Sequence, residues 1–398
     1  MKTKKDFDVI IIGGLGHVGL PLGLVFADKG LKVCLYDVDA RKARQVKSGV
    51  MPFIEYGAEK IIKKVLKNGR LTVSEDIKDV SRAGAVIIAI GTPIDEHLNP
   101  KLKTFLGLIA RLKKYLDPAQ VVIVRSTVYP HTCGRISKML GGPRGVKVAY
   151  CPERIAQGYA ISELTKLPQI VSGVTPEAGD MAARLFAKVS PSVIRATVEE
   201  AELIKLFTNA WRYLQFAATN QFYMIARNYG VDYNKVRKAM REGYSRATNL
   251  PSAGFAAGPC LLKDTMQLAA FYGNNFLLGQ TAMMINEGLP GFIAEGLKEK
   301  HDLSRARVGI LGMSFKADID DIRESLSYKL RKILRFYGAT VYCSDEYVRD
   351  PGFIGMEELI RKSDIVIIGV PHSKYKGLEL AAKKEIVDLW GIAGKGAA

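Results

Sequence analysis

The chain has 398 residues, of which 48% are hydrophobic and 25% charged, so it can bury a large core and divide into two or three domains. Its formal net charge of +18 suits anionic partners, but lysines and arginines are spread along the chain without a nucleic-acid-binding motif, so we expect no nucleic-acid partner. Five scattered cysteines with no CxxC pair argue against a disulfide framework or a zinc ribbon and indicate a reducing, cytoplasmic location.

The N-terminal stretch looks at first like an export signal, because basic residues precede an apolar run. Glycines recur inside that run at Gly13, Gly14, Gly16 and Gly19, which fits a strand, a tight turn and a helix better than a signal peptide. No other apolar run is long enough and free enough of charge to span a bilayer, so we expect no membrane partner.

Short β-branched runs alternate with amphipathic stretches through the first half of the chain. This alternation is typical of strands that are buried on both faces of a parallel sheet, with helices as the crossovers. Small or polar residues follow nearly every run, and in such a sheet they should line one crevice beyond the strand ends. The expected strands cover residues 8–12, 32–36, 85–90, 121–125, 147–150 and 169–173.

A long helical period follows at residues 199–230, about 30 residues that would span roughly 45 Å. Its apolar positions are too numerous for a single buried stripe, so we expect this helix to form a homodimer. A second, smaller α/β unit comes after it. We therefore predict an α/β fold with two Rossmann-like, doubly wound parallel-sheet domains joined by a long central helix, divided at residues 1–197, 198–300 and 301–398.

The first turn carries Gly14, Gly16 and Gly19 in GxGxxG spacing, directly after a strand and before a helix. Such glycines permit a tight turn, close approach to a pyrophosphate and close helix packing, while the helix N-terminus favours the anion. The next strand ends at Asp37, about 20 residues later, where an acid receives the ribose hydroxyls of NAD and repels the phosphate of NADP. Alternatively, Asp37 only caps the following helix. We predict NAD as the cofactor.

The stretch "AGPCLLKDT" places a cysteine three and four residues ahead of a lysine and an aspartate. If Cys260 begins a helix, Lys263 and Asp264 lie on the same face one turn later, so a thiol, an ammonium and a carboxylate converge. The alternative is a small core cysteine with no chemical role. A lysine or a helix N-terminus nearby would favour the reactive thiolate.

Taken together, the motifs resemble the UDP-glucose/GDP-mannose dehydrogenase family over nearly the whole chain. The matching stretches are "GLGHVGLP", "GTP" at 91–93, "STVYP" at 126–130, "CPER" with "LPQIVSG", "AELIKLFTN", "CLLKD" and "FKADIDDIRES". The resemblance implies oxidation of the C6 alcohol of a nucleotide sugar to a carboxylate with two NAD. Cys260 would hold the intermediate aldehyde as a thiohemiacetal and then a thioester.

The resemblance also assigns the site residues. The catalytic set is Cys260, Lys205, Asn209, Asp264, Glu153 and Thr127. The cofactor set is Gly14, Gly16, His17, Val18, Gly19, Asp37, Thr92, Thr127, Lys263 and Arg323. The substrate set is Glu153, Arg154, Lys205, Asn209, Arg246, Gly258 and Lys316. Without these motifs Lys205 would be read as a surface lysine of the long helix, and Glu153 and Thr127 as capping or turn residues. The acids of "FKADIDDIRES" lack the spacing of a calcium loop, so we expect no metal.

The chain departs from the family pattern ahead of the nucleophile. Family members carry GxGGxC, whereas this chain has "GFAAGPC", so the methyl groups of Ala256 and Ala257 and the fixed dihedral of Pro259 should reshape the backbone that cradles the hexose. Arg246 also lies about two residues closer to Cys260 than the family's substrate arginine.

The motifs allow more than one sugar substrate and more than one class of function. UDP-glucose is our first choice, because "CLLKDTMQL" favours it, whereas "GVPHSKYKGL" resembles family members that act on UDP-N-acetylhexosamines. GDP-mannose is a further alternative. A different class of function is a catalytically silent protein that binds NAD or a nucleotide sugar, and a third is a two-electron dehydrogenase that needs no cysteine.

Overall fold

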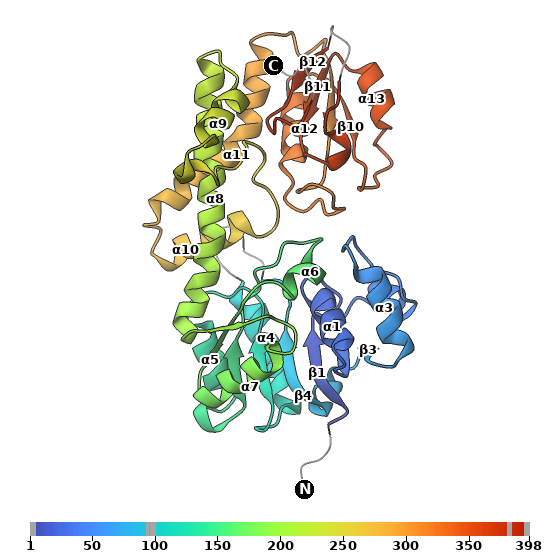
Figure 1. The fold of residues 1–398 in the computed structure, drawn as a ribbon, viewed down its shortest axis with the longest axis vertical. Coiled ribbons are helices and arrows are strands. Elements are labelled where there is room, and N and C mark those ends of the chain that lie inside the picture. Colours follow the sequence, from blue (N-terminus) through green and yellow to red (C-terminus); the bar gives the residue numbers. More distant parts are fainter. Residues whose placement is uncertain (1–4, 93–94, 96–100, 380–383, 394–398) are drawn as a thin grey trace. The chain divides into compact units, whose positions relative to one another are not determined.

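The computed structural model describes residues 5–92, 95, 101–379 and 384–393. The chain forms two compact units, Met1–Phe207 and Thr208–Ala398. Helix α8 (Val198–Asn228) begins in the first unit and continues into the second (Figure 1). Its length and its end agree with the sequence prediction, and Gly230 stops it with a φ of 78°.

The first unit is built on an eight-stranded sheet in the order β3-β2-β1-β4-β5-β6-β7-β8. Its strands are β1 (Phe7–Ile12), β2 (Val33–Tyr36), β3 (Leu71–Ser74), β4 (Ala83–Ile88), β5 (Val121–Val124), β6 (Lys147–Tyr150), β7 (Gln169–Gly173) and β8 (Val193–Arg195). Neighbours are parallel except for β6 and β7, which are antiparallel. The strand order reverses between β1 and β4, and a ligand is expected beyond the carboxyl ends of strands at such a point.

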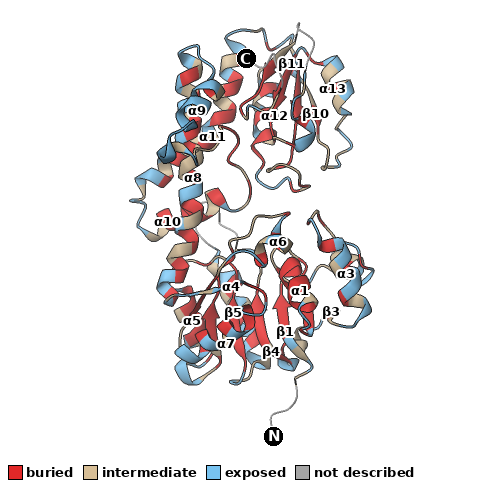
Figure 2. Ribbon diagram, viewed as in Figure 1, coloured by how far each residue is buried: buried red, intermediate tan, exposed pale blue. Residues whose placement is uncertain are grey.

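Helices cover both faces of this sheet. They are α1 (Gly19–Asp28), α2 (Ala40–Lys47), α3 (Ala58–Lys67), α4 (Leu102–Leu112), α5 (Thr132–Met139), α6 (Ala160–Leu164) and α7 (Pro176–Phe186). Along β1, Val9 and Ile11 pack in the core beneath α1, α3 and α7, while Ile10 and Ile12 pack in the core beneath α4 and α5. Figure 2 shows these strands in red, which marks buried residues. Because both of their faces are buried, the strands need continuous apolar runs.

The second unit contains a four-stranded parallel sheet in the order β10-β9-β11-β12. The strands are β9 (Arg307–Leu311), β10 (Thr340–Ser344), β11 (Ile365–Ile368) and β12 (Glu385–Val387). The helices, besides α8, are α9 (Tyr233–Arg241), α10 (Leu261–Phe271), α11 (Leu277–Lys298), α12 (Leu326–Phe336) and α13 (Met356–Lys362). Val308 and Ile310 pack with α11 and α12, whereas Val366 and Ile368 pack with α13.

The observed architecture confirms the predicted fold class, with two parallel-sheet units and a long helix between them in sequence. The strands β3 and β8 were missed because each is short and partly exposed, at the edges of the first sheet. The three-part division at residues 197 and 300 stays a prediction. Within the described ranges, no helix is long and apolar enough to cross a membrane.

Candidate active site

The turn after β1 has the form expected of a phosphate-binding loop. Gly13 turns the chain with a φ of 77°. A Cβ at Gly14 would lie 2.8 Å from that of Leu35, and one at Gly19 would lie 2.3 Å from the Gly13 carbonyl oxygen. At Gly16 the nearest atom would be 3.5 Å away. Gly14 and Gly19 are therefore required by packing, whereas Gly16 leaves room at the start of α1 for a pyrophosphate to approach the backbone.

Asp37 holds this turn instead of capping a helix. Its Oδ2 accepts a hydrogen bond from the Leu15 N–H at 3.0 Å, and its Oδ1 accepts from the Val38 N–H at 2.8 Å. Helix α2 is capped by Asp39, whose Oδ1 accepts from the Lys42 N–H and whose pKa is lowered by that bond. The capping interpretation of Asp37 is therefore wrong, and its position beside the glycine turn suits a ribose.

The remaining cofactor candidates of the first unit lie in the loops at the same end of the sheet. The imidazole of His17 lies against Phe53, with ring centroids 3.9 Å apart, and Val18 begins α1. Thr92 Oγ1 donates to the Thr127 carbonyl oxygen at 2.7 Å, which ties the loop after β4 to the loop after β5. Pro93 of the "GTP" motif lies outside the described residues.

Glu153, just after β6, is held by groups on both of its carboxylate oxygens. Oε1 accepts from the N–H groups of Arg154 and Ile155 at 2.6 and 2.7 Å, and Oε2 forms an ion pair with Arg125. The Arg125 side chain is fully buried and also donates to Gln169 Oε1 at 2.6 Å. Sequence reasoning missed Arg125, although a charge that closes the apolar run "VVIV" could have revealed it. The structure holds the Glu153 carboxyl group in one place as a hydrogen-bond acceptor.

Cys260 is the N-cap residue of α10 and is exposed, whereas the other four cysteines are buried. One turn later the Asp264 carboxylate is 1% exposed, and its Oδ1 lies 3.1 Å from Lys263 Nζ. Its Oδ2 accepts from Asn209 Nδ2 on α8 at 2.5 Å. The Lys263 ammonium and the Asp264 carboxylate meet as predicted, while the convergence of the Cys260 thiol with them stays a prediction. Because Cys260 is exposed, the core-cysteine interpretation is wrong.

Lys205 and Asn209 lie one turn apart on the same face of α8. Lys205 is 8% exposed and Asn209 5% exposed. A lysine that only extended into solvent from a long helix would keep its ammonium hydrated, so this burial disfavours that interpretation of Lys205.

The loop 251–259 before Cys260 is held from within the second unit. Asn220 Nδ2 donates to the Gly254 carbonyl oxygen at 3.0 Å, and its Oδ1 accepts from the Gly254 N–H at 2.9 Å. Ala256 is buried in the apolar cluster of Tyr213, and Ala257 packs against the larger core of the unit. The two methyl groups therefore take part in packing, and the expectation that they and Pro259 reshape the sugar cradle stays a prediction.

Residues 312–325, here called the strap, join β9 to α12 and contact this loop. Gly258 has a φ of 100°, and a Cβ there would lie 2.5 Å from the Phe315 ring. Its N–H donates to the Glu324 carbonyl oxygen at 3.3 Å. The pKa of Arg323 is raised, first by its hydrogen bond to Asp321 and also by the nearby Cys260 thiolate charge. Arg323, expected on the cofactor side, thus also acts on the candidate nucleophile.

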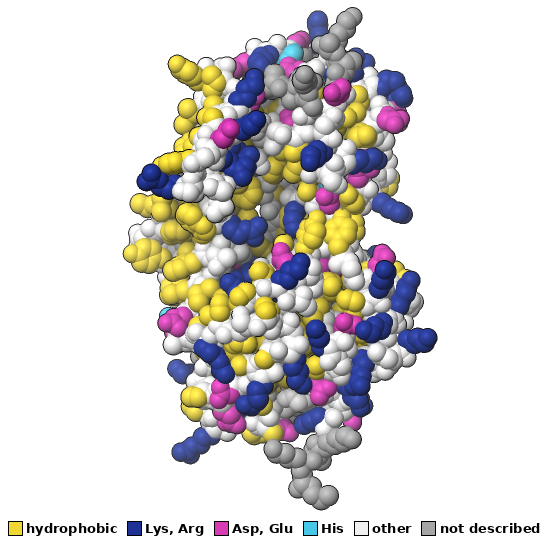
Figure 3. Space-filling model, in the orientation of Figure 1, with side chains coloured by type: hydrophobic (Ala, Val, Ile, Leu, Met, Phe, Trp, Pro, Cys, Tyr) yellow, Lys and Arg dark blue, Asp and Glu magenta, His cyan; other side chains and the backbone are white. Residues whose placement is uncertain are grey.

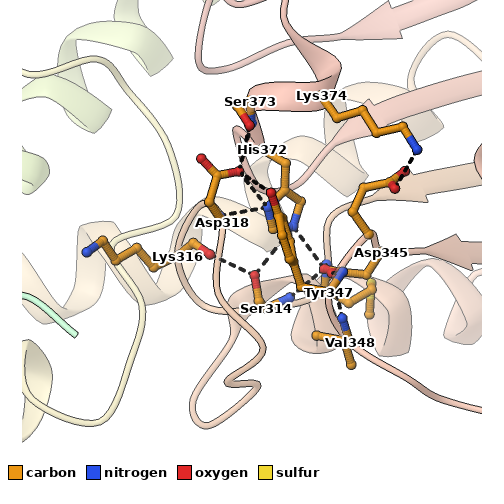
Figure 4. Close-up of polar contacts among 11 residues, drawn as sticks. Ser314, Lys316, Asp318, Asp345, Tyr347, Val348, His372, Ser373 and Lys374 are labelled. Carbon is orange, nitrogen blue, oxygen red and sulfur yellow. Dashed lines mark hydrogen bonds and ion pairs between the residues drawn. The ribbon is translucent and has the colours of Figure 1, made fainter. Parts of the chain in front are cut away.

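A buried polar cluster anchors the strap (Figure 4). The fully buried carboxylate of Asp345, at the end of β10, accepts from the N–H groups of Met313, Ser314, Tyr347 and Val348 and contacts His372 Nε2 at 3.0 Å. Burial raises the pKa of Asp345, but the hydrogen bond with His372 and those from the backbone N–H groups lower it to about 2. Sequence reasoning missed this cluster.

Two substrate candidates have surroundings that leave their roles as predictions. Arg246 lies in a short turn, Ser245–Ala247, with its guanidinium 4.9 Å from the centre of the Tyr244 ring. The Lys316 side chain extends away from the polar cluster in Figure 4.

Substitution of the two glycines should separate packing from cofactor binding. In Gly19→Ala the new Cβ meets backbone, so we expect a loss of about 1–3 kcal/mol in the free energy of unfolding. In Gly16→Ala we expect stability to change by less than about 0.5 kcal/mol while NADH affinity falls about tenfold or more. Thermal unfolding and NADH fluorescence titration measure the two effects. Unchanged affinity in Gly16→Ala would contradict the assignment.

The Asp345 cluster should make stability depend on pH in acid. Its folded pKa of about 2 is below the ordinary 3.8, so the unfolded chain takes up the proton first as pH falls. The contribution is complete above about pH 5 and is lost between about pH 4 and 2, amounting to about 2 kcal/mol. Urea unfolding of the wild type and of Asp345→Asn across this range tests this. Equal slopes against pH would show that the carboxylate contributes nothing.

Comparison with known proteins agrees with this geometry. Sequence profiles of the UDP-glucose/GDP-mannose dehydrogenase family match at residues 8–190 (NAD binding domain), 199–287 (central domain) and 309–395 (UDP binding domain). A UDP-N-acetyl-D-mannosamine dehydrogenase of Pyrococcus horikoshii is 29% identical over 382 residues, which cover 93% of this chain and 90% of that protein.

Two solved structures are similar over the whole chain. The UDP-D-ManNAc dehydrogenase of Pyrococcus horikoshii has a TM-score of 0.90 at 27% identity, with 98% of this chain and 97% of that one covered. A UDP-glucose dehydrogenase of Pyrobaculum islandicum has a TM-score of 0.88 at 26% identity, with 100% and 96% covered. With the glycine turn and Asp37 in place for NAD, the chain belongs to the UDP-glucose/GDP-mannose dehydrogenase family of NAD-dependent nucleotide-sugar dehydrogenases.

Proposed function

We propose that this enzyme oxidises the C6 hydroxyl of a UDP-N-acetylhexosamine, with UDP-N-acetylmannosamine first among these sugars, to the carboxylate in two NAD-dependent steps. The chemistry rests on one observation: Cys260 is exposed at the start of α10, with the buried Asp264 carboxylate one turn behind it. Several of the similar curated proteins are UDP-N-acetyl-D-mannosamine dehydrogenases. They favour that sugar over UDP-glucose, our first choice, and agree with the "GVPHSKYKGL" stretch.

Between the two oxidations, the intermediate aldehyde is held by a covalent bond to Cys260. The alcohol loses a hydride and a proton to become an aldehyde, and the thiolate of Cys260 adds to its C6 carbon to give a thiohemiacetal. Loss of a second hydride and of the hydroxyl proton gives a thioester, and water then breaks the C–S bond to release the carboxylate and the thiol. NAD accepts one hydride in each oxidation.

The candidate residues of the two units have the chemistry that these steps need. Arg323 and the N-terminus of α10 bring positive charge toward Cys260, and we propose that Lys263, three residues along the chain, adds to it; this charge favours the thiolate. We propose that Lys205 and Asn209 stabilise negative charge on the C6 oxygen, and that Asp264 positions Lys263 and the hydrolytic water. Glu153, held by Arg125 and two backbone N–H groups, would orient a sugar hydroxyl or the hydrolytic water as a hydrogen-bond acceptor.

Two alternatives remain open to experiment. A silent binding protein would need neither an exposed cysteine nor a buried Asn209–Asp264 pair, and a two-electron dehydrogenase would release one NADH for each sugar. The stoichiometry of NADH separates all three.

The proposed function predicts two NADH for each molecule of limiting UDP-N-acetylmannosamine, read at 340 nm. UDP-N-acetylglucosamine, UDP-glucose and GDP-mannose are run in parallel. Cys260→Ser should lower the four-electron turnover by at least about a thousandfold, because a serine hydroxyl stays un-ionised and is a far weaker nucleophile than a thiolate. Cys151→Ser, at a buried cysteine, is the matched control and should keep most of the activity.

Labelling with iodoacetamide gives an independent check. The wild type should be alkylated first at Cys260, the exposed cysteine, and Cys260→Ser should lose that fast phase. Full activity in Cys260→Ser, or one NADH for each sugar, would reject the proposed mechanism. Two NADH from UDP-glucose alone would reject the sugar.

We also propose that the enzyme is a homodimer through α8. In the second unit Trp211, Phe222 and Ile225 lie on one face of α8, because they are spaced by 11 and 3 residues, and Tyr229 directly follows the helix. These four side chains are 43–84% exposed. Figure 3 shows apolar side chains along the edge formed by α8 to α11. A face of this kind marks a protein–protein contact, and a second copy can present the same face symmetrically.

Charge on this face should break the dimer. We expect the wild type to have twice the chain mass of 43.7 kDa in size-exclusion chromatography with light scattering. Ile225→Arg should shift it to the single-chain mass, because burying an unpaired charge costs several kcal/mol. Phe336→Ser, at a more exposed apolar residue on α12, should stay dimeric. A monomeric wild type would reject the proposal.

A further inference from the structure

A buried histidine contacts Asp318, the residue that is here called the tip of the strap. The imidazole of His372, shortly after β11, is fully buried. Its Nδ1 accepts from the Asp318 N–H at 2.9 Å, so in the neutral ring the proton is on Nε2, which lies 3.0 Å from Asp345 Oδ2. Figure 4 shows the ring between the two aspartates. His372 therefore joins the strap to the end of β10.

The strap residue bound by this histidine has an unusual conformation. Asp318 has a φ of 58°, in the left-handed region that non-glycine residues rarely adopt. Its Oδ1 accepts from the Ser373 N–H at 2.9 Å and from the Tyr347 hydroxyl at 3.1 Å. Such a conformation persists only where surrounding contacts determine it, and here the amide and the carboxylate are held from two sides.

The tip determines where two functional candidates lie. The two arms of the strap are joined by the Phe315 N–H, which donates to the Asp321 carbonyl oxygen at 2.9 Å. Lys316 follows Phe315 on one arm and Arg323 lies on the other. The Phe315 ring also packs against Gly258 of the loop before Cys260. Movement of the tip would therefore move the cations and the loop together.

We propose that His372 is a positioning residue for nucleotide-sugar binding: it fixes the tip of the strap so that Lys316 meets the nucleotide sugar while Arg323 stays beside Cys260. This proposal rests on the proposed function. The neutral ring offers one acceptor and one donor, and both are used between elements that are far apart in sequence.

His372→Phe keeps a ring of similar size but removes the acceptor and the donor. We expect KM for the nucleotide sugar to rise about tenfold, because the half-buried Asp318 N–H loses its partner, with kcat changed less than about threefold. His372→Asn should recover much of the affinity, since its carboxamide oxygen can take the place of Nδ1. The control is Tyr375→Phe: this buried hydroxyl has no hydrogen-bond partner in the described structure, and the ring contacts His372 edge-on.

Two measurements keep the test independent of folding and of turnover. Hydrogen exchange followed by mass spectrometry should show faster exchange in the strap for His372→Phe but not for Tyr375→Phe. Tyr347→Phe, which removes one bond to Asp318, should raise KM about twofold to fivefold and decides the matter if His372→Phe does not fold.

Several outcomes would overturn the positioning role. Unchanged KM and unchanged strap exchange in His372→Phe would do so, as would equal effects in Tyr375→Phe, which would assign them to packing. If the wild type binds uridine diphosphate but oxidises no nucleotide sugar, the proposed function fails by itself. In that case the positioning role is tested by measuring the dissociation constant of uridine diphosphate by calorimetry. Equal values for the wild type and His372→Phe would reject the positioning role.

Discussion

The buried hydrogen bond between Asn209 and Asp264 is the contact on which the candidate active site depends. A carboxylate that is 1% exposed is costly unless its oxygens have partners, and here the partners are the Asn209 amide on α8 and the Lys263 ammonium on α10. This pairing sets the register of α10 against α8. Because Cys260 is one turn before Asp264, the same register leaves the thiol exposed at the N-terminus of α10. The helix dipole places partial positive charge there, which favours a thiolate.

The first unit uses the same device with the charges reversed. Arg125 is a fully buried cation whose partners are Glu153, Gln169 and backbone carbonyls after β6. Removing one partner of such a pair leaves the other charge uncompensated, so the pair holds the loop after β6 in one shape. In both units a reactive side chain is therefore kept on a short loop whose position is determined by a buried charge.

Most of the fold could be predicted because the apolar runs and the glycine spacing reflect interactions between residues that are close in sequence. The glycine turn, the long helix and the start of α10 all depend on residues close in sequence. The polar clusters depend instead on partners far apart in the chain. Asp345 and His372 look like ordinary loop residues after strands, and their contacts exist only once β9, β10 and β11 are aligned. Buried Arg125 and the hydrogen bonds of Asn220 with Gly254 were not predicted for the same reason.

The loop before Cys260 departs from the family pattern at residues whose surroundings only the structure reveals. "GFAAGPC" predicts that two added methyl groups reshape a sugar cradle, and in the structure Ala256 and Ala257 pack in apolar cores. The path of the loop is set by its glycines, because a Cβ at Gly254 would lie 2.4 Å from the Trp390 ring and one at Gly258 would lie 2.5 Å from Phe315. The aromatic rings come from the β9–β12 region, so the shape offered to a hexose depends on how the strap and the C-terminal loop pack. Substitutions there can change sugar selectivity while every catalytic motif stays the same, which is why those motifs identify the reaction better than the sugar.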